Sequence, residues 1–336
     1  MSPERTPSTP RATGAAPDHQ RHAGCLLASA CGDALGESLA ERSRGALSTT
    51  PGSPDTIDGT APLRSTASTA LTLALADQLT YGSFLPNTEL DQDALARRLA
   101  RTWRDDASRG YEAGAVRVFL GMQNAIPWQE TTALDSARAS GDDTTAPVLP
   151  IGLLSLPLNR LTQMARAAAR VTHTHPLALD GAALQACAIA YARRSPNDQP
   201  LAATHLISTV GRYATTPELR TRLSRLSGLL RGSYTPADVA RELGRGPSAL
   251  ETVPAALAAF LHSPDDVAAA VRFALDVGGQ STRLVFLTAG LVGARCGRDA
   301  IPHAWAARLE GWRGIIATAQ ALHKRDKQLL HSGSPR

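Results

Sequence analysis

The sequence predicts an all-α fold, a compact single-domain bundle of many helices. Alanine and leucine, both strong helix formers, are abundant, whereas aromatic residues make up only 4% of the 336 residues. The alternating runs of valine, isoleucine, threonine and tyrosine that are typical of strands are almost absent. Helical patterns instead follow one another along the chain, and a hydrophobic fraction of 43% is enough to bury a large core.

The first predicted helix covers 24–43 and is rich in small residues. Glycine inside a helix is unfavourable by roughly 1 kcal/mol relative to alanine, so Gly32 and Gly36 indicate a close approach of backbone or ligand. Residues 44–63 carry many turn formers and predict a loop. Further helices are predicted at 66–82, 92–104, 111–124, 157–171, 180–194, 200–213, 217–230, 235–243, 249–261, 264–276, 282–296 and 302–323.

Several helix ends have recognisable signals. Asp180, Thr235 and Ser263 are predicted N-caps, and Pro236 and Pro302 suit first-turn positions. Residues 126–150 look irregular. No internal repeat of the length typical of solenoids is visible.

The two ends differ from the middle. Residues 1–22 lack the apolar stretch of a signal peptide and are expected to form a disordered leader. A single helical domain then covers 23–323, and a basic disordered tail covers 324–336. No apolar run reaches the ~18 residues that a membrane span needs, so we expect a cytoplasmic protein without membrane contact.

The charge distribution argues against a nucleic-acid-binding protein, and the cysteine spacing argues against disulfides or a zinc site. The formal net charge is +5, and residues 313–336 supply +4 of it, from five basic residues against one acid. A nucleic-acid partner is therefore not expected, and the oligomeric state stays open. The cysteines form no CxxC pair and are expected to be reduced core residues; they are Cys25, Cys31, Cys187 and Cys296.

Three segments place glycine or threonine clusters at helix starts: GDALG (32–36), THTHP (172–176) and GGQSTRLVFLTAGLVGARCG (278–297). Taken alone, GDALG could be a helix-packing contact. His173 and His175 are two residues apart, so they point to different sides of a helix and are not expected to share a metal. A loop histidine bonded to backbone is the simpler alternative.

Together with SRGYEAG (108–114), SGDDTTAPVLPIGL (140–153) and IPHAW (301–305), these segments resemble the ADP-ribosylglycohydrolase family in the same order over about 23–312. The resemblance implies a compact helical bundle with one deep cleft. In working members the cleft holds two magnesium ions and an ADP-ribose. Aspartates of a Thr-Asp-Asp-Thr and a Gly-Gly-Asp-Thr-Asp-Thr segment hold the metals, which activate a water.

This sequence departs from the family at those aspartates. Thr66, Ala67, Ser68 and Thr69 stand on the first segment. Gly278 and Gly279 match the second, but its remaining positions are Gln280, Ser281, Thr282 and Arg283. Ala40 stands where the family has a further glutamate, with Glu41 one residue late and Glu37 three residues early. The glycine-rich stretch becomes Gly141, Asp142 and Asp143. We therefore expect no magnesium site and no cofactor.

Two functions follow from these replacements. The first is a pseudoenzyme that binds an ADP-ribose-like, nucleotide-like or other small anionic ligand, because helix starts and a guanidinium attract anions. Its ligand set would be Arg283, Thr66, Ser68, Thr69, Gln280, Ser281, Thr282 and Gly141. Alternatively, Arg283 closes the cleft by pairing with Asp142 or Asp143.

The second function is a metal-independent enzyme that acts on an N-glycoside or on a small molecule of specialised metabolism. Such cleavage needs an acid and a base. The candidates are Asp142, Asp143, His173 and Glu41, with histidine suited by its near-neutral pKa. Whether the protein is an enzyme stays open at this point, although metal-dependent hydrolysis is expected to be absent.

Overall fold

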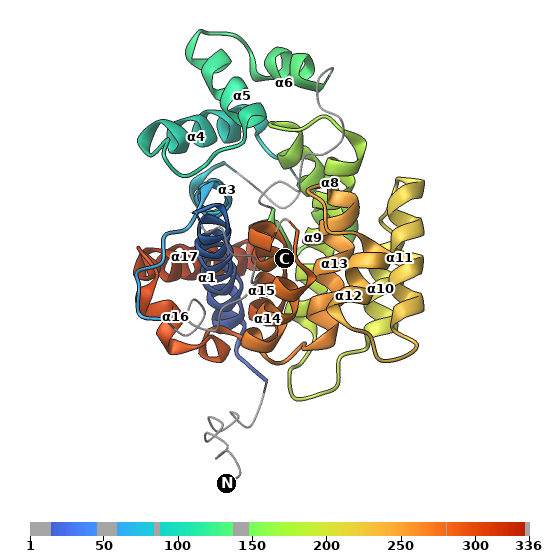
Figure 1. Cartoon of the computed structure of the whole chain (residues 1–336). Coiled ribbons are helices and arrows are strands. Elements are labelled where there is room, and N and C mark those ends of the chain that lie inside the picture. Colours follow the sequence, from blue (N-terminus) through green and yellow to red (C-terminus); the bar gives the residue numbers. More distant parts are fainter. Residues whose placement is uncertain (1–14, 46–58, 84–87, 137–147, 280, 333–336) are drawn as a thin grey trace.

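The computed structural model describes residues 15–45, 59–83, 88–136, 148–279 and 281–332. Over these residues it is built from α-helices and one 3-10 turn, Arg298–Ala300 (Figure 1). The helices are α1 (Asp18–Gly45), α3 (Ala67–Tyr81), α4 (Gln92–Asp105), α5 (Ala113–Gln123), α6 (Trp128–Ser136), α7 (Leu149–Gly152), α8 (Leu158–Arg170), α9 (Pro176–Arg194), α10 (Ala203–Gly211), α11 (Pro217–Leu229), α12 (Pro236–Leu243), α13 (Ala249–His262), α14 (Val267–Val277), α15 (Ser281–Cys296), α16 (His303–Arg308) and α17 (Trp312–Ser332). The all-α prediction is confirmed.

Helices α1 and α15 pack against each other at the centre of the molecule, with α17 on one side and α9, α13 and α14 on the other (Figure 1). Small residues allow their backbones to touch. A Cβ at Gly32 would lie 2.9 Å from the Val285 carbonyl oxygen, and a Cβ at Gly36 would lie 2.5 Å from the Thr282 Cα. The close approach predicted for both glycines is therefore confirmed, and the neighbour is helix backbone.

The core is a continuous cluster of small and aliphatic side chains drawn from almost every helix. All four cysteines are buried within it as free thiols, as predicted. Within the described residues, no helix combines the length and apolar character that a membrane span requires.

Three helix starts differ from the prediction. Asp180 lies inside α9, which begins at Pro176 with His175 as its N-cap. Ser263 ends α13, and Asp266 is the N-cap of α14. Pro302 is the N-cap of α16 and not part of its first turn. The prediction for α12 is confirmed, because Thr235 forms a capping box with Asp238 and Pro236 follows it.

The predicted helix over 302–323 is two helices. Gly311, at a φ of +69°, separates α16 from α17, and Leu63 pairs with Leu309 in an isolated bridge at the break. The stretch 126–150, predicted to be irregular, contains α6 and the start of α7. Helix α1 starts at Asp18, within the segment assigned to a leader, and α17 extends to Ser332, within the segment assigned to a tail.

Candidate functional site

The candidate site comprises the starts of α3 and α15, which we call the helix-start site (residues 66–69 and 281–283). Both starts contact helix α1. Asp33 of α1 bonds the start of α3, and Glu37, one turn further along α1, accepts a 3.4 Å hydrogen bond from Thr282 Oγ1. Residues four apart lie on the same side of a helix, so α1 brings the two starts to neighbouring turns.

Asp33 is fully buried and acts as the anchor of α3. Its Oδ2 accepts hydrogen bonds from the Thr66 backbone N–H and from Thr69 Oγ1, and its Oδ1 accepts one from Thr66 Oγ1, each at 2.7 Å. Burial raises the pKa of the Asp33 carboxyl, and the hydrogen bonds from Thr69 and Thr66 lower it by less, so the pKa is raised.

The first turn of α3 has few donors left for a ligand. Thr66 is the N-cap and accepts from the Ser68 N–H at 3.2 Å, while the Ala67 N–H donates to the Arg109 carbonyl oxygen at 2.8 Å. The hydroxyl protons of Thr66 and Thr69 go to Asp33. The chain itself therefore uses the N–H groups of Ala67 and Ser68, and an anion at this site would depend mainly on Arg283 and on the start of α15.

Arg283, in the first turn of α15, forms the charged part of the site. Its Nη2 donates to Glu112 Oε1, and Glu112 is the N-cap residue of α5. The other carboxylate oxygen, Oε2, lies 3.9 Å from Nε2 of His173 in the loop between α8 and α9. Three segments distant in sequence thus meet at one carboxylate. The Arg283 and Glu112 side chains are 22% and 34% exposed, so solvent reaches both.

Two glycines precede α15 and adopt backbone conformations that other residues rarely take. Gly278 and Gly279 have φ angles of +78° and +73°. A Cβ at Gly279 would also collide with the Arg245 carbonyl oxygen. The glycine pair therefore sets the direction in which the chain enters α15 and presents Thr282 and Arg283.

The structure locates only part of the predicted residue set. Arg283, Thr282, Thr66, Ser68, Thr69 and His173 lie in the segments just described. Ser281 begins α15 and Glu41 lies in α1, but their side chains are not described. Gln280, Gly141, Asp142 and Asp143 lie outside the described residues. The partner that Arg283 has among the described residues is Glu112, and the other histidine, His175, caps α9 by accepting from the Leu177 N–H at 3.2 Å.

Comparison with known proteins agrees with this architecture. The family model described as ADP-ribosylglycohydrolase matches residues 15–330. The chain belongs to the ADP-ribosylglycohydrolase family. The human protein "ADP-ribosylhydrolase ARH3" is 27% identical over 350 residues, covering 93% of this chain and 95% of that protein. The Bos taurus protein of the same name is 26% identical, covering 93% and 94%.

A solved structure described as "ADP-ribosylglycohydrolase-related protein complex" superposes with a TM-score of 0.62. It is 22% identical in sequence, and the match covers 92% of this chain and 99% of that chain. This likeness shows that the chain has the ADP-ribosylglycohydrolase fold.

Sequence reasoning missed two acids of this ADP-ribosylglycohydrolase site. Asp33 lies in GDALG and Glu112 lies in SRGYEAG, so both segments were recognised without a role for these carboxylates. The signal for Glu112 was present, because SRGYEAG is one of the segments that carries the family resemblance. The meeting of Glu112 with Arg283 needs the three-dimensional fold, since 170 residues separate them.

Proposed function

We propose that this member of the family binds an ADP-ribose-like or nucleotide-like anion at the helix-start site without the dinuclear magnesium chemistry of working members. The observation that carries the proposal is Arg283, a guanidinium in the first turn of α15 that is held by Glu112 and partly open to solvent. The names of the relatives, ADP-ribosylhydrolases, support ADP-ribose as the ligand class.

The side chains present do not fit two magnesium ions. Magnesium prefers carboxylate oxygens and water in octahedral geometry. Ala67 has no side-chain oxygen, and the hydroxyls of Ser68 and Thr282 are neutral and weak ligands. Asp33 already accepts three hydrogen bonds, Glu37 accepts one from Thr282, and Glu112 is held by Arg283. The positive charge of Arg283 then favours an anion over a dication.

A phosphate group can compete with Glu112 for Arg283. Partly exposed ion pairs typically contribute about 0–1 kcal/mol, because water screens them and two side chains must be ordered. The diphosphate of ADP-ribose carries two negative charges, where the Glu112 carboxylate carries one, and its oxygens match the geometry of the guanidinium fork. A diphosphate ligand can therefore take the arginine from Glu112 at little cost. Glu112 is then released toward His173.

A second function is supported by the spacing of Glu112 and His173. A carboxylate oxygen 3.9 Å from an imidazole nitrogen is too close to flank a glycosidic bond, but it can orient the imidazole as the base that activates a water for metal-independent cleavage of an N-glycosidic bond. Here His173 would keep the role that the sequence predicted for it, and Glu112 would take the place of Asp142, Asp143 or Glu41. The same experiment separates the two functions.

The experiment measures ADP-ribose binding by calorimetry, first with a chelator and then with added magnesium, together with release of ADP-ribose from ADP-ribosylated peptides. We expect equal affinity in both buffers and no release, with the human relative as positive control. Magnesium-dependent release would overturn the proposal. Release in the chelator would support the metal-independent enzyme instead.

A matched pair of arginine variants locates the ligand. Arg283→Ala should weaken ADP-ribose binding by roughly 10- to 100-fold, the usual loss for a charge-assisted hydrogen bond. Arg231→Ala removes the same charge from an exposed position after α11 and should leave binding unchanged. Equal affinity of both variants would place the ligand elsewhere.

A further inference from the structure

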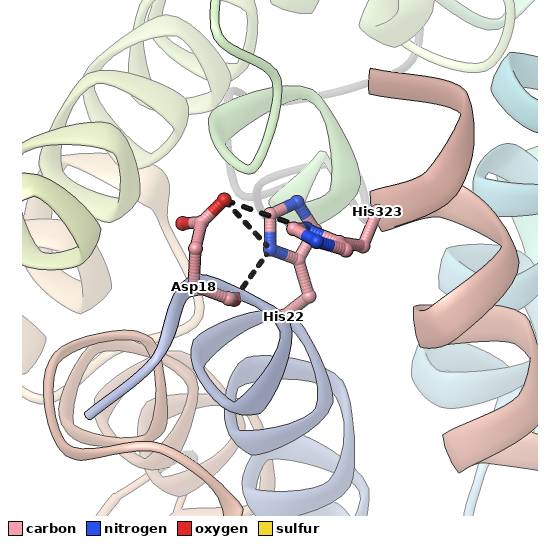
Figure 2. Close-up of side chains that lie close together, drawn as sticks. All are labelled: Asp18, His22 and His323. Carbon is pink, nitrogen blue, oxygen red and sulfur yellow. Dashed lines mark hydrogen bonds and ion pairs between the residues drawn. The ribbon is translucent and has the colours of Figure 1, made fainter. Parts of the chain in front are cut away.

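A second group of polar side chains lies at the opposite end of α1. Asp18 and His22 occupy the first turn and a half of α1, and His323 reaches them from α17 (Figure 2). Each residue offers one ligand atom, and these atoms all lie within 4.8 Å of one another. Fifteen helical residues at 1.5 Å each place Asp18 about 22 Å along α1 from Asp33, so the group is separate from the helix-start site.

The spacing approaches that of a metal site. His323 Nδ1 lies 3.4 Å from Asp18 Oδ2, His22 Nδ1 lies 3.9 Å from the same oxygen, and the three ligand atoms all lie within 4.8 Å of one another. Two ligands of a tetrahedral zinc ion, each about 2.0–2.1 Å from the metal, are about 3.4 Å apart. The separation between His323 and Asp18 therefore matches already, and metal binding requires the His22 ring to move closer to the other two ligands.

His22 Nε2 is a buried nitrogen that lacks a hydrogen bond, on a side chain that is 0% exposed. His323 Nδ1 also lacks a hydrogen bond, although it lies at ion-pair distance from Asp18 Oδ2. Buried polar atoms nearly always have a partner, and an exception in a folded protein points to a water or ion that completes the group. His22 Nε2 belongs to a ring that packs against the His323 ring, with centroids 4.8 Å apart, so a metal could bind both imidazoles.

The carboxylate is oriented as metal-binding carboxylates usually are. Arg193 Nη1 holds Oδ1 of Asp18 at 2.6 Å, which leaves Oδ2 directed toward the two histidines. The His22 Nδ1 lies 2.9 Å from the backbone oxygen of Asp18, so the first turn of α1 also holds this ring. While Nδ1 donates to that oxygen, the lone pair of the ring is on Nε2, and Nε2 is then the atom that this ring offers to a metal. Such outer hydrogen bonds keep ligands in place before the metal arrives.

We propose that Asp18, His22 and His323 bind one zinc ion or a similar first-row transition metal, with water completing the coordination. Two imidazoles and one carboxylate select such metals over magnesium and calcium, which prefer oxygen ligands. The bound metal would join the start of α1 to α17 and so stabilise the folded chain, since it binds there and not to the unfolded protein.

The test uses the full chain without a polyhistidine tag, after treatment with a chelator and dialysis. Zinc should bind with one equivalent per chain and raise the melting temperature, whereas magnesium should leave it unchanged. Cobalt(II) should give the intense visible absorption of a tetrahedral site. A group completed by water alone would show neither effect, and that result would overturn the proposal.

Two histidine variants assign the ligands. His323→Ala, at a side chain with 18% exposure, should weaken zinc binding at least about tenfold and remove the cobalt absorption. His205→Ala is the matched control, because His205 is an exposed histidine bonded to Tyr191 on another part of the surface. If His323→Ala bound zinc as the control does, the assignment would be wrong. His323→Ala is chosen over His22→Ala because the buried His22 is also needed for packing.

Discussion

Asp180 is a buried carboxylate that connects three helices. Its Oδ1 accepts from Arg166 Nη2 at 2.6 Å, and its Oδ2 accepts from the backbone N–H and the hydroxyl of Thr216, at 2.9 and 2.8 Å. Thr216 is the N-cap residue of α11. Asp180 therefore supplies the acceptor that the start of a distant helix lacks, and it does not cap its own helix.

The charge of Asp180 should stabilise the protein in a pH-dependent way. Burial raises the pKa of Asp180, but hydrogen bonds from Thr216, Arg166 and Thr215 lower it by more, so the pKa lies below the usual range of an aspartate. A depressed carboxyl pKa stabilises the fold fully above the unfolded pKa, and this stabilisation is lost as the pH falls through the folded pKa. Asp180→Asn should cost roughly 3–5 kcal/mol at neutral pH, because it leaves Arg166 without its carboxylate.

Urea unfolding of both proteins over a pH series checks this. The difference in unfolding free energy between wild type and Asp180→Asn should be constant above about pH 4 and should shrink below it. A difference that stays constant down to acid pH would mean that the hydrogen bonds, and not the charge, account for the effect.

Arg283 shows how far a single residue of the site could be predicted. Its place in the family motif identified it as the exceptional side chain, because a cation in the first turn opposes the helix dipole by roughly 0.3–1 kcal/mol. That argument required an anion nearby, and the structure supplies Glu112. Which carboxylate it would be could not be predicted, because motif order does not give the contacts between loops.

At the scale of elements, the close contact between α1 and α15 fixes the positions of Glu37 and Thr282 relative to each other. Gly36→Ala should destabilise the protein by roughly 1–3 kcal/mol, because the new Cβ would lie 2.5 Å from the Thr282 Cα and the two helix backbones would have to move apart. Displacing Thr282 also moves Arg283, so ADP-ribose binding should weaken with it.

Gly228→Ala is the matched control for this variant. Gly228 lies within α11 and a Cβ there would have no atom within 4 Å, so alanine should stabilise the helix by roughly 0.4–1 kcal/mol. Thermal unfolding of the two variants should give opposite signs. Equal effects would show that helix propensity, and not the α1–α15 contact, controls the result at Gly36.

Helix existence was predictable from the sequence, whereas several helix ends were not. Thr235 with Asp238 is a capping box that can be recognised within four residues, and the structure confirms it. The break between α16 and α17 occurs where Leu63 pairs with Leu309, a contact between segments nearly 250 residues apart. A local sequence pattern can reveal a cap motif, but it cannot reveal a contact between segments that are distant in the sequence.

At the scale of the whole molecule, the first and last described helices, α1 and α17, pack together (Figure 1). The family order of motifs predicted the bundle as a whole, because each motif marks one helix start or loop. It did not predict the contacts of the first turn of α1, because 1–22 is polar and has the composition of a leader. In the structure Arg21 and His22 are buried there.

Two N-terminal deletions of different length should therefore differ in stability. Deletion of residues 1–22 removes the Asp18–Arg193 ion pair, the hydrogen bond of 3.1 Å from Arg21 to the Ser195 carbonyl oxygen and the buried His22 ring. Arg193 would remain buried without its carboxylate, which alone typically costs several kcal/mol. We expect the unfolding free energy of this variant to be lower by several kcal/mol, so that it unfolds at a lower urea concentration, or the variant to fail to fold. Deletion of residues 1–14 keeps all of these contacts and should unfold as the full chain does. Both variants are compared by urea unfolding at neutral pH with a chelator present, so that a metal at Asp18 does not contribute. If the two deletions had equal stability, residues 15–22 would belong with the leader, as their composition suggests.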